Sequence, residues 1–234
     1  MKNKVVAVLL CFCMAGVTFG GQCQVSAQEY DVEEKGVYGY EDGERFTDQG
    51  IEYQYIASTQ SLRTYSLTNC TKDIIEIPSY VAGYPVTEIK CYGFFPSSAT
   101  AIRIPSTVTS VNSNFYGRNL KNIYVDSNNQ KYTSINGVLF SKDGTVLCEY
   151  PYGRSDNSYE VPSGTKEIET WAFGCKNLEY VKIPSTVDYM FRAFTGADGL
   201  ECKEVDSGNQ VYKSIDGVVY SKSGDTLIRV PNNK

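Results

Sequence analysis

The side chains that could do chemistry in this sequence are mainly carboxylates, because its 234 residues include no histidine. That absence excludes Ser-His-Asp and Cys-His nucleophilic sites and the usual zinc sites, which need an imidazole. A glycosidase needs only two carboxyl groups, so this class remains open. The acidic side chains considered for it are Glu167, Glu169, Glu179, Asp188, Glu201 and Glu204. All are expected to face solvent and no pair stands out, so we predict no enzyme, no catalytic residue and no cofactor.

One short motif weakly resembles a calcium-binding loop. It runs from Asp126 to Gln130 and is repeated from Asp206 to Asn209. Both copies lack the further acidic ligands and the closing glutamate of such a loop. Asp, Asn, Ser and Gly strongly favour turns, so we expect two solvated turns and no metal site.

The motif belongs to a long internal repeat. Residues 125–151 and 205–231 are identical at 15 of 27 positions without a gap, at an offset of 80 residues. Within each copy, residues 137–150 and 217–230 alternate apolar and polar side chains around a turn, Asp143-Gly144 in the first and Ser223-Gly224 in the second. Alternation on both sides of a glycine turn predicts a β-hairpin insert.

A shorter repeat surrounds these hairpins. Its clearest copy, residues 169–187, has an apolar skeleton with the spacing of a leucine-rich repeat, formed by Ala172, Phe173, Cys175, Leu178, Val181 and Ile183. Related segments place strand ends at Ile77, Ile104, Val125, Val161, Ile183 and Val205. Most separations are 21 to 27 residues, as expected for single coils, and the longest contains a hairpin. A mainly β solenoid is therefore predicted.

The first residues have the pattern of an export signal. Lys2 and Lys4 precede an apolar run over residues 5–17, which is too short to span a bilayer. We expect a signal peptide over residues 1–27 with cleavage after Ala27, a secreted or cell-surface protein, and a flexible acidic leader over residues 28–45. Loss of the two lysines leaves 20 basic against 27 acidic groups. That balance argues against a nucleic-acid partner, and no further apolar segment predicts membrane insertion of the mature chain.

Five cysteines follow the predicted cleavage point, namely Cys70, Cys91, Cys148, Cys175 and Cys202. An oxidising compartment would permit a bridge such as Cys70 to Cys91, yet the spacings match no compact disulfide framework. Buried, unpaired cysteines are the favoured interpretation, and pairing stays open.

The segments IPSTV, IPSYVAGYPVTEI and TKEIETWAFGCKNLEYVKIP, with the hairpin DGVVYSKSGDTLIRVP, resemble the BspA-like leucine-rich-repeat family over residues 46–231. The resemblance implies a secreted or surface protein of bacteria or mucosal parasites and, by analogy with some members, binding to host matrix proteins such as fibronectin or fibrinogen. We divide the chain into an N-terminal β cap, residues 46–76, and a solenoid, residues 77–234. The solenoid holds two long units, about 103–181 and 182–234, the second incomplete.

Any ligand is expected on the outward positions of the concave strands, where aromatic and arginine side chains are the usual anchors. The candidate ligand-binding residues are Arg103, Tyr124, Tyr180, Lys182 and Glu204 on or beside these positions, and Trp171 on an adjoining turn. Protein recognition or adhesion, possibly to host extracellular matrix, is the leading hypothesis. The alternatives are a glycan-binding or nutrient-capture protein that stacks sugars on Tyr124, Trp171 and Tyr180, and a structural or truncated repeat protein whose uncapped C-terminal coil self-associates.

Overall fold

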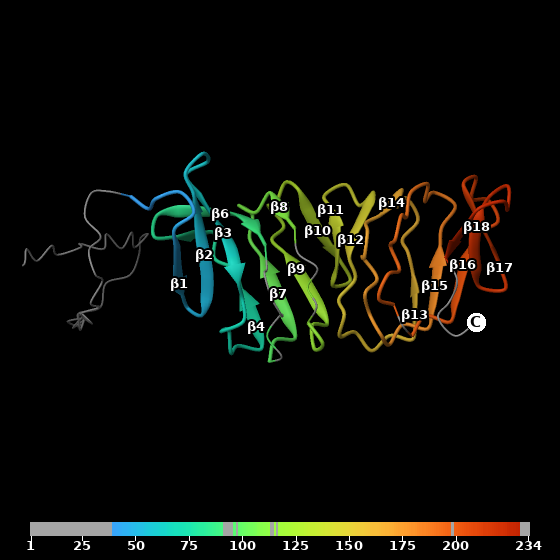
Figure 1. The fold of residues 1–234 in the computed structure, drawn as a ribbon, viewed down its shortest axis with the longest axis horizontal. Helices are drawn as coiled ribbons and strands as arrows, with labels where there is room; N and C mark the ends of the chain where they lie inside the picture. The colour runs from blue at the N-terminus through green and yellow to red at the C-terminus, as the bar shows by residue number, and fades with distance from the viewer. Residues whose placement is uncertain are drawn as a thin grey trace, which may run out of the picture. The chain divides into compact units, whose positions relative to one another are not determined.

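The computed structural model describes residues 39–90, 96, 98–112, 115, 117–197 and 199–229. The predicted signal peptide and residues 28–38 of the predicted leader lie outside the described residues. The described part consists of strands and turns and includes no helix, and hence none able to cross a membrane. Its coils follow one another in chain order, which confirms the predicted leucine-rich-repeat-type solenoid (Figure 1).

One side of the coils carries two parallel three-stranded sheets, which together we call the first ladder. Its strands in order are β4 (Ile74–Glu76), β7 (Ala101–Ile104) and β9 (Asn122–Val125), then β13 (Ser158–Glu160), β15 (Tyr180–Ile183) and β16 (Cys202–Val205). Four strand ends fall where the sequence predicts them, and the predicted ends Ile77 and Val161 lie one residue beyond the strands.

A second ladder runs along another edge of the same coils. It contains β3 (Ser61–Ser66), β6 (Tyr84–Ile89) and β8 (Ser110–Val111), followed by β12 (Val146–Glu149) and β14 (Glu167–Ile168). The pairs β3–β6, β6–β8 and β12–β14 are parallel, and a parallel bridge from Glu167 to Tyr189 extends the series. Figure 1 shows β6, β8 and β14 along the upper edge and β4, β7 and β13 along the lower edge.

The core fills the space between the ladders. Inward side chains of the first ladder, such as Ile102, Ile123 and Val181, are fully buried. The repeat leucines Leu120 and Leu178 come from the turns that precede the strands and are also buried. Each coil thus covers the apolar side chains of its neighbours, and a single coil could not bury them alone.

Both predicted hairpin inserts are present, each with an extra strand. β11 (Val138–Ser141) pairs antiparallel with β12 across the predicted Asp143-Gly144 turn, and β18 (Val218–Ser221) pairs with β19 (Leu227–Arg229). The strands that precede them, β10 (Tyr132–Ile135) and β17 (Tyr212–Ile215), were not predicted from the sequence.

The turns that leave these two strands have the residue types of tight hairpin turns. Asn136-Gly137 joins β10 to β11 with φ angles of 52° and 80°, and Asp216-Gly217 joins β17 to β18 with φ angles of 50° and 78°. Asn-Gly and Asp-Gly are the preferred pairs of a type I′ hairpin turn, because both central residues need positive φ.

The N-terminal cap is an antiparallel meander of β1 (Arg45–Asp48), β2 (Ile51–Ile56) and β3, and the short hairpin of β5 (Tyr80–Val81) with β6 follows it. Its predicted limits need two corrections. Residues 40–45 were assigned to a flexible leader, but Tyr40 stacks on Phe46 with ring centroids 4.5 Å apart and also packs against Tyr55. At the other limit, β4 already pairs with β7 as the first strand of the first ladder.

The turn after β9 is built around a buried asparagine. Asn129 is fully buried, and its Nδ2 donates to the carbonyl oxygens of Pro105 and Val108 at 2.8 and 2.9 Å. Its Oδ1 accepts the backbone N–H groups of Lys131 and Tyr132, both at 2.8 Å. Asn209 makes the same bonds in the second copy, with Pro184, Val187, Val211 and Tyr212. The expectation of solvated turns is therefore wrong for these two side chains, which join one coil to the next.

Replacing Asn129 by alanine removes four hydrogen bonds and leaves backbone groups unpaired in the core. We expect Asn129→Ala to lower the free energy of unfolding by about 3 kcal/mol, measured by urea denaturation. The exposed neighbour supplies the control, since Asn128→Ala should change stability by no more than about 0.5 kcal/mol. Equal effects of the two substitutions would contradict this structural role.

Candidate functional site

The outward side chains of the first ladder align in two rows. Glu76, Arg103 and Tyr124 occupy paired positions on β4, β7 and β9. Glu160, Lys182 and Glu204 occupy the same positions on β13, β15 and β16. Neighbouring strands of a sheet lie about 4.8 Å apart, so each row is a closely spaced line of side chains on a fixed backbone.

An ion pair and a cation–π contact join the side chains of the first row. Arg103 Nε lies 3.4 Å from Glu76 Oε1, and its guanidinium carbon lies 5.1 Å from the centroid of the Tyr124 ring. The side chains of Arg103 and Glu76 are 52 % and 69 % exposed, so this ion pair contributes little to stability. The groups remain accessible to a ligand.

The second row repeats the arrangement with a lysine. Lys182 Nζ donates to Glu160 Oε1 at 2.9 Å, and this hydrogen bond and the charge of the carboxylate raise the pKa of the lysine. Tyr180, on the same strand as Lys182, donates its hydroxyl to the carboxylate of Glu204. Each cation in the two rows therefore lies beside a carboxylate from the neighbouring coil.

A hollow of about 320 Å³ opens on the first row, where β4, β7 and β9 end. Its lining includes Glu76, Arg103, Pro105, Tyr124 and Asp126. The surface thus offers carboxylates, a guanidinium and an aromatic ring around one depression.

We call the two rows, together with Tyr180 and the aspartates that follow β9 and β16, the ladder face. It carries five carboxylates and two cations, Glu76, Asp126, Glu160, Glu204 and Asp206 against Arg103 and Lys182. The face is therefore net acidic, and attraction to a basic partner follows from that balance.

The sequence reading missed Glu76, Glu160 and the aspartates as members of this face. A local signal could have found the glutamates, because an outward residue precedes an apolar residue and a proline in each of the segments Glu76-Ile-Pro, Arg103-Ile-Pro, Glu160-Val-Pro and Lys182-Ile-Pro. The expected positions of Arg103, Tyr124, Tyr180, Lys182 and Glu204 all lie on the ladder face.

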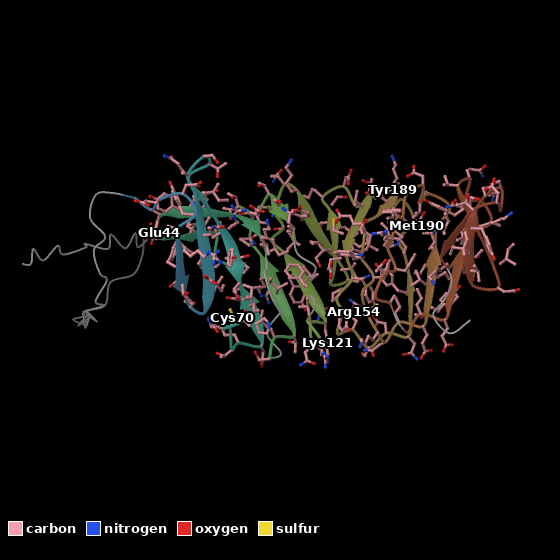
Figure 2. The ribbon with its side chains drawn as sticks, in the orientation of Figure 1. Glu44, Cys70, Lys121, Arg154, Tyr189 and Met190 are labelled. Atoms are coloured by element: carbon pink, nitrogen blue, oxygen red, sulfur yellow. The ribbon has the colours of Figure 1, made fainter. Side chains whose placement is uncertain are left out.

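Trp171, the remaining candidate, lies elsewhere. It follows β14 of the second ladder, adopts a φ of 66° and donates its backbone N–H to the carbonyl of Arg192 in the next coil. Its exposed aromatic companions there are Tyr189 and Phe191. Figure 2 shows Tyr189 at the upper edge of the ribbon, the edge that carries β14 in Figure 1. Trp171 is therefore separated from Tyr124 and Tyr180.

The first hairpin lies between the two rows. The Ile123 N–H of β9 donates to the carbonyl of Gly137 at 2.9 Å, so the Asn136-Gly137 turn takes the place of the next strand. Arg154 reaches this turn from the following coil and donates to the carbonyl of Asn136 at 2.6 Å. Hairpin and arginine separate the ladder face into two parts.

The carboxylates considered for glycosidase chemistry remain dispersed over the coils. Five of the six are exposed, and Glu167 is half-buried. Glu149 of β12, which was not considered, is only 7 % exposed, and burial, followed by the negative charge of Glu169, raises its pKa well above the usual value. Its carboxylate accepts a hydrogen bond from the backbone N–H of Phe115. Within the described ranges, no three acidic or cysteine side chains are placed to hold a metal ion.

The cysteines fit the interpretation as small buried side chains where the structure describes them. Cys70 and Cys175 are free thiols, 7 % and 0 % exposed, and Cys148 is a half-buried free thiol. The Cys70 thiol donates to the carbonyl of Gly50. Cys91, its suggested partner, lies outside the described residues.

Comparison with known proteins agrees with this architecture. Residues 44–151 and 152–220 match the BspA type leucine rich repeat region, in six copies. The chain belongs to the BspA-type leucine-rich repeat family. Proteins of this bacterial family are typically secreted or displayed on the cell surface, and their repeats typically serve protein interaction rather than catalysis.

Solved structures of leucine-rich repeat proteins are similar to parts of the chain. One, from Eubacterium ventriosum, is 27 % identical with a TM-score of 0.46, over 57 % of this chain and 42 % of that protein. A leucine rich cell surface protein from Faecalibacterium prausnitzii is 16 % identical, with a TM-score of 0.40, over 82 % and 62 %. The pneumococcal vaccine antigen PcpA is 16 % identical, with a TM-score of 0.42, over 73 % and 72 %. No curated protein matches. The BspA-type chain thus spans less than half of the Eubacterium ventriosum protein.

The buried carboxyl of Glu149 predicts a pH dependence of stability in this BspA-type protein. Because its pKa is raised in the folded state, its contribution is fully present below the unfolded-state pKa and is lost as pH rises through the folded-state pKa. We expect Glu149→Gln, which keeps the acceptor for the Phe115 N–H, to be more stable than the wild type at pH 8. This advantage should shrink towards pH 4 in urea titrations. The exposed Glu179→Gln is the control, and parallel pH profiles for Glu149→Gln and wild type would contradict the prediction.

Proposed function

We propose that the chain is a secreted or cell-surface recognition protein that binds a protein ligand through its ladder face, with host extracellular matrix as the first class of ligand to test. The main support for this proposal is the pair of exposed rows, Glu76–Arg103–Tyr124 and Glu160–Lys182–Glu204, on a backbone held by parallel strand pairing. Such a backbone is ordered before binding, so little conformational freedom is lost when a ligand docks.

The chemistry of the face favours a protein over a small molecule. Arginine and tyrosine are frequent anchors of protein interfaces, and Arg103 lies against Tyr124 beside the hollow. The carboxylates spread along both rows instead of converging on one cavity. An extended, basic segment of a partner protein would pair with several of them at once, and its approach would be accelerated by the net acidic charge.

A glycan ligand remains the alternative, although the expected stacking platform of Tyr124, Trp171 and Tyr180 is divided between two places. Only Tyr124 and Tyr180 belong to the ladder face, and they lie in different sheets. Trp171, Tyr189 and Phe191 are exposed aromatic side chains at the second ladder. A glycan array with Tyr124→Ala and Trp171→Ala variants separates these two locations.

Charge reversal on the ladder face tests the protein-binding proposal. The purified chain is applied to immobilised fibronectin, fibrinogen and intact host cells, and saturable binding to at least one is expected. Glu76→Lys and Glu204→Lys should each weaken that binding about tenfold or more, because each replaces a carboxylate that would pair with the basic partner by a charge that repels it.

The matched controls lie at the second ladder. Asp188→Lys reverses the charge of an exposed carboxylate beside the second ladder, as Glu204→Lys does on the ladder face, and Tyr189→Ala removes an exposed tyrosine as Tyr124→Ala does. Both controls should bind like the wild type. Absence of saturable binding to all three surfaces rejects the host-adhesin form of the proposal, and equal losses in the control variants reject the ladder face.

Export is tested separately from binding. We expect the protein recovered outside the expressing cell to begin at Gln28, because Val25-Ser26-Ala27 provides small residues before the cleavage point. Intact-mass measurement gives the new N-terminus directly. Ala27→Leu should reduce cleavage there, and an exported chain that retains Met1 would contradict the signal-peptide assignment.

A further inference from the structure

The outward side of the second ladder changes character in one coil. Its outward positions come in pairs two residues apart, and the register of the ladder together with the repeat sequence makes them equivalent from coil to coil. The pairs in chain order are Glu88 and Lys90, Ser110 and Asn112, Glu167 and Glu169, and Tyr189 and Phe191. The strand β12 of the hairpin insert is set apart, with the half-buried Val146 and Cys148 at these positions. Three coils thus present polar side chains, and the fourth presents two aromatic rings.

The two rings are exposed because they point outward. Tyr189 and Phe191 are 50 % and 56 % exposed, whereas Met190 between them is buried. Figure 2 shows Tyr189 at the upper edge of the ribbon and Met190 further in. Asn112 and Glu169, which are equivalent to Phe191 and have coils before and after them in the chain, are exposed as well. The exposure therefore follows from the direction of the side chain, and the core does not require an aromatic ring there.

Trp171, the only tryptophan of the chain, lies beside this pair. Thr170 Oγ1 donates to the carbonyl of Phe191 at 3.0 Å, and the Trp171 N–H donates to the carbonyl of Arg192 at 3.1 Å, so the two backbone segments are adjacent. The Trp171 side chain is exposed, and its φ of 66° is a conformation that glycine or asparagine adopts at lower cost. Neither the backbone nor the core explains a tryptophan at this position. We call Trp171, Tyr189 and Phe191 the aromatic surface.

Charged side chains lie among the three rings. The exposed ones are Lys166, Glu169, Asp188 and Arg192. The guanidinium carbon of Arg192 lies 5.2 Å from the centroid of the Phe191 ring. The two cations balance the two carboxylates, and Glu167 adds one half-buried carboxylate. Unlike the net acidic ladder face, the aromatic surface therefore does not select a strongly charged ligand.

We propose that the aromatic surface binds an extended neutral glycan. A sugar ring packs its C–H faces on aromatic rings, and the hydroxyl groups around it exchange hydrogen bonds with carboxylates and guanidinium groups. The centre of a protein interface is depleted in charged side chains, whereas rings and charges alternate here within a few residues. The proposal is independent of the protein ligand proposed for the ladder face.

The single tryptophan reports directly on this surface. The purified chain is titrated with the neutral soluble polysaccharides laminarin, mannan, xyloglucan and dextran, and with the anionic heparin for comparison. At least one neutral polysaccharide should shift the Trp171 emission saturably, and heparin should do so less. No saturable shift with any neutral polysaccharide, or a stronger response to heparin, would overturn the proposal.

Substitutions taken from an earlier coil test the individual rings. Tyr189→Ser and Phe191→Asn introduce the residues that the chain carries at the equivalent outward positions 110 and 112, so the fold should be retained, as thermal unfolding checks. Each variant should bind the responding polysaccharide about fivefold more weakly in isothermal titration calorimetry, as expected for the loss of one ring contact. Tyr124→Ser on the ladder face is the matched control and should bind like the wild type. Unchanged affinity in either variant, or an equal loss in the control, would contradict the assignment.

The responding polysaccharide also separates the two sites. Added in excess to the assays on fibronectin, fibrinogen and host cells, it occupies the aromatic surface, so the Tyr189→Ala control then reports on the ladder face alone. Binding that persists under these conditions belongs to the ladder face and leaves the glycan site intact. Binding that the polysaccharide abolishes assigns adhesion to the aromatic surface, which supports this inference and contradicts the function proposed for the ladder face.

Discussion

The structure depends on the contact between successive coils, because no single coil can bury its own apolar residues. Ile102 is covered only because Ile75 and Ile123 lie on either side of it in paired strands. Backbone hydrogen bonds in the two ladders set the spacing, and buried asparagines such as Asn129 tie one coil to the turn of the previous one. Stability in such a stack is approximately the sum of the contacts between neighbouring coils.

The same contact generates the ladder face. A strand alternates the direction of its side chains, so fixing Ile102 and Ile104 in the core fixes Arg103 outward between them. Parallel pairing in register then aligns Arg103 with Glu76 and Tyr124. The outward positions of the ladder face are therefore left unconstrained by packing, so their chemistry can vary without cost to the core.

The coils and one turn of each hairpin could be predicted from the sequence, because the repeated residue types have defined physical roles in these elements. The spacing of apolar positions such as Leu178, Val181 and Ile183 predicted the coil. Pro184 marks the end of its strand, because proline has no N–H to continue the ladder. The hairpin at Asp143-Gly144 was predicted by its alternation. The preceding turn at Asn136-Gly137 carries an equally clear signal, but the predicted insert began only at residue 137, so the first strand of each hairpin was not predicted.

The site was less readable, for reasons of geometry. Trp171 was grouped with Tyr124 because both are aromatic and near a repeat strand, yet which ladder a turn residue adjoins depends on how the chain winds. Asn129 was predicted to be a solvated turn residue because asparagine and the residues around it favour turns. Its burial follows from the carbonyl groups of the previous coil, which lies 21 to 24 residues earlier. Local patterns cannot supply contacts at that separation.

The hairpin insert has opposite consequences for the two ladders. Through β12 and β14 it continues the second ladder, whereas its Asn136-Gly137 turn occupies the position of a strand beside β9 in the first. The ladder face is consequently two short rows separated by one turn and by Arg154, each row with one cation beside carboxylates. A partner that engages both rows must bridge this interruption, so two contact points on a folded protein or a segment extended over several strand widths satisfy the geometry better than a compact small molecule does.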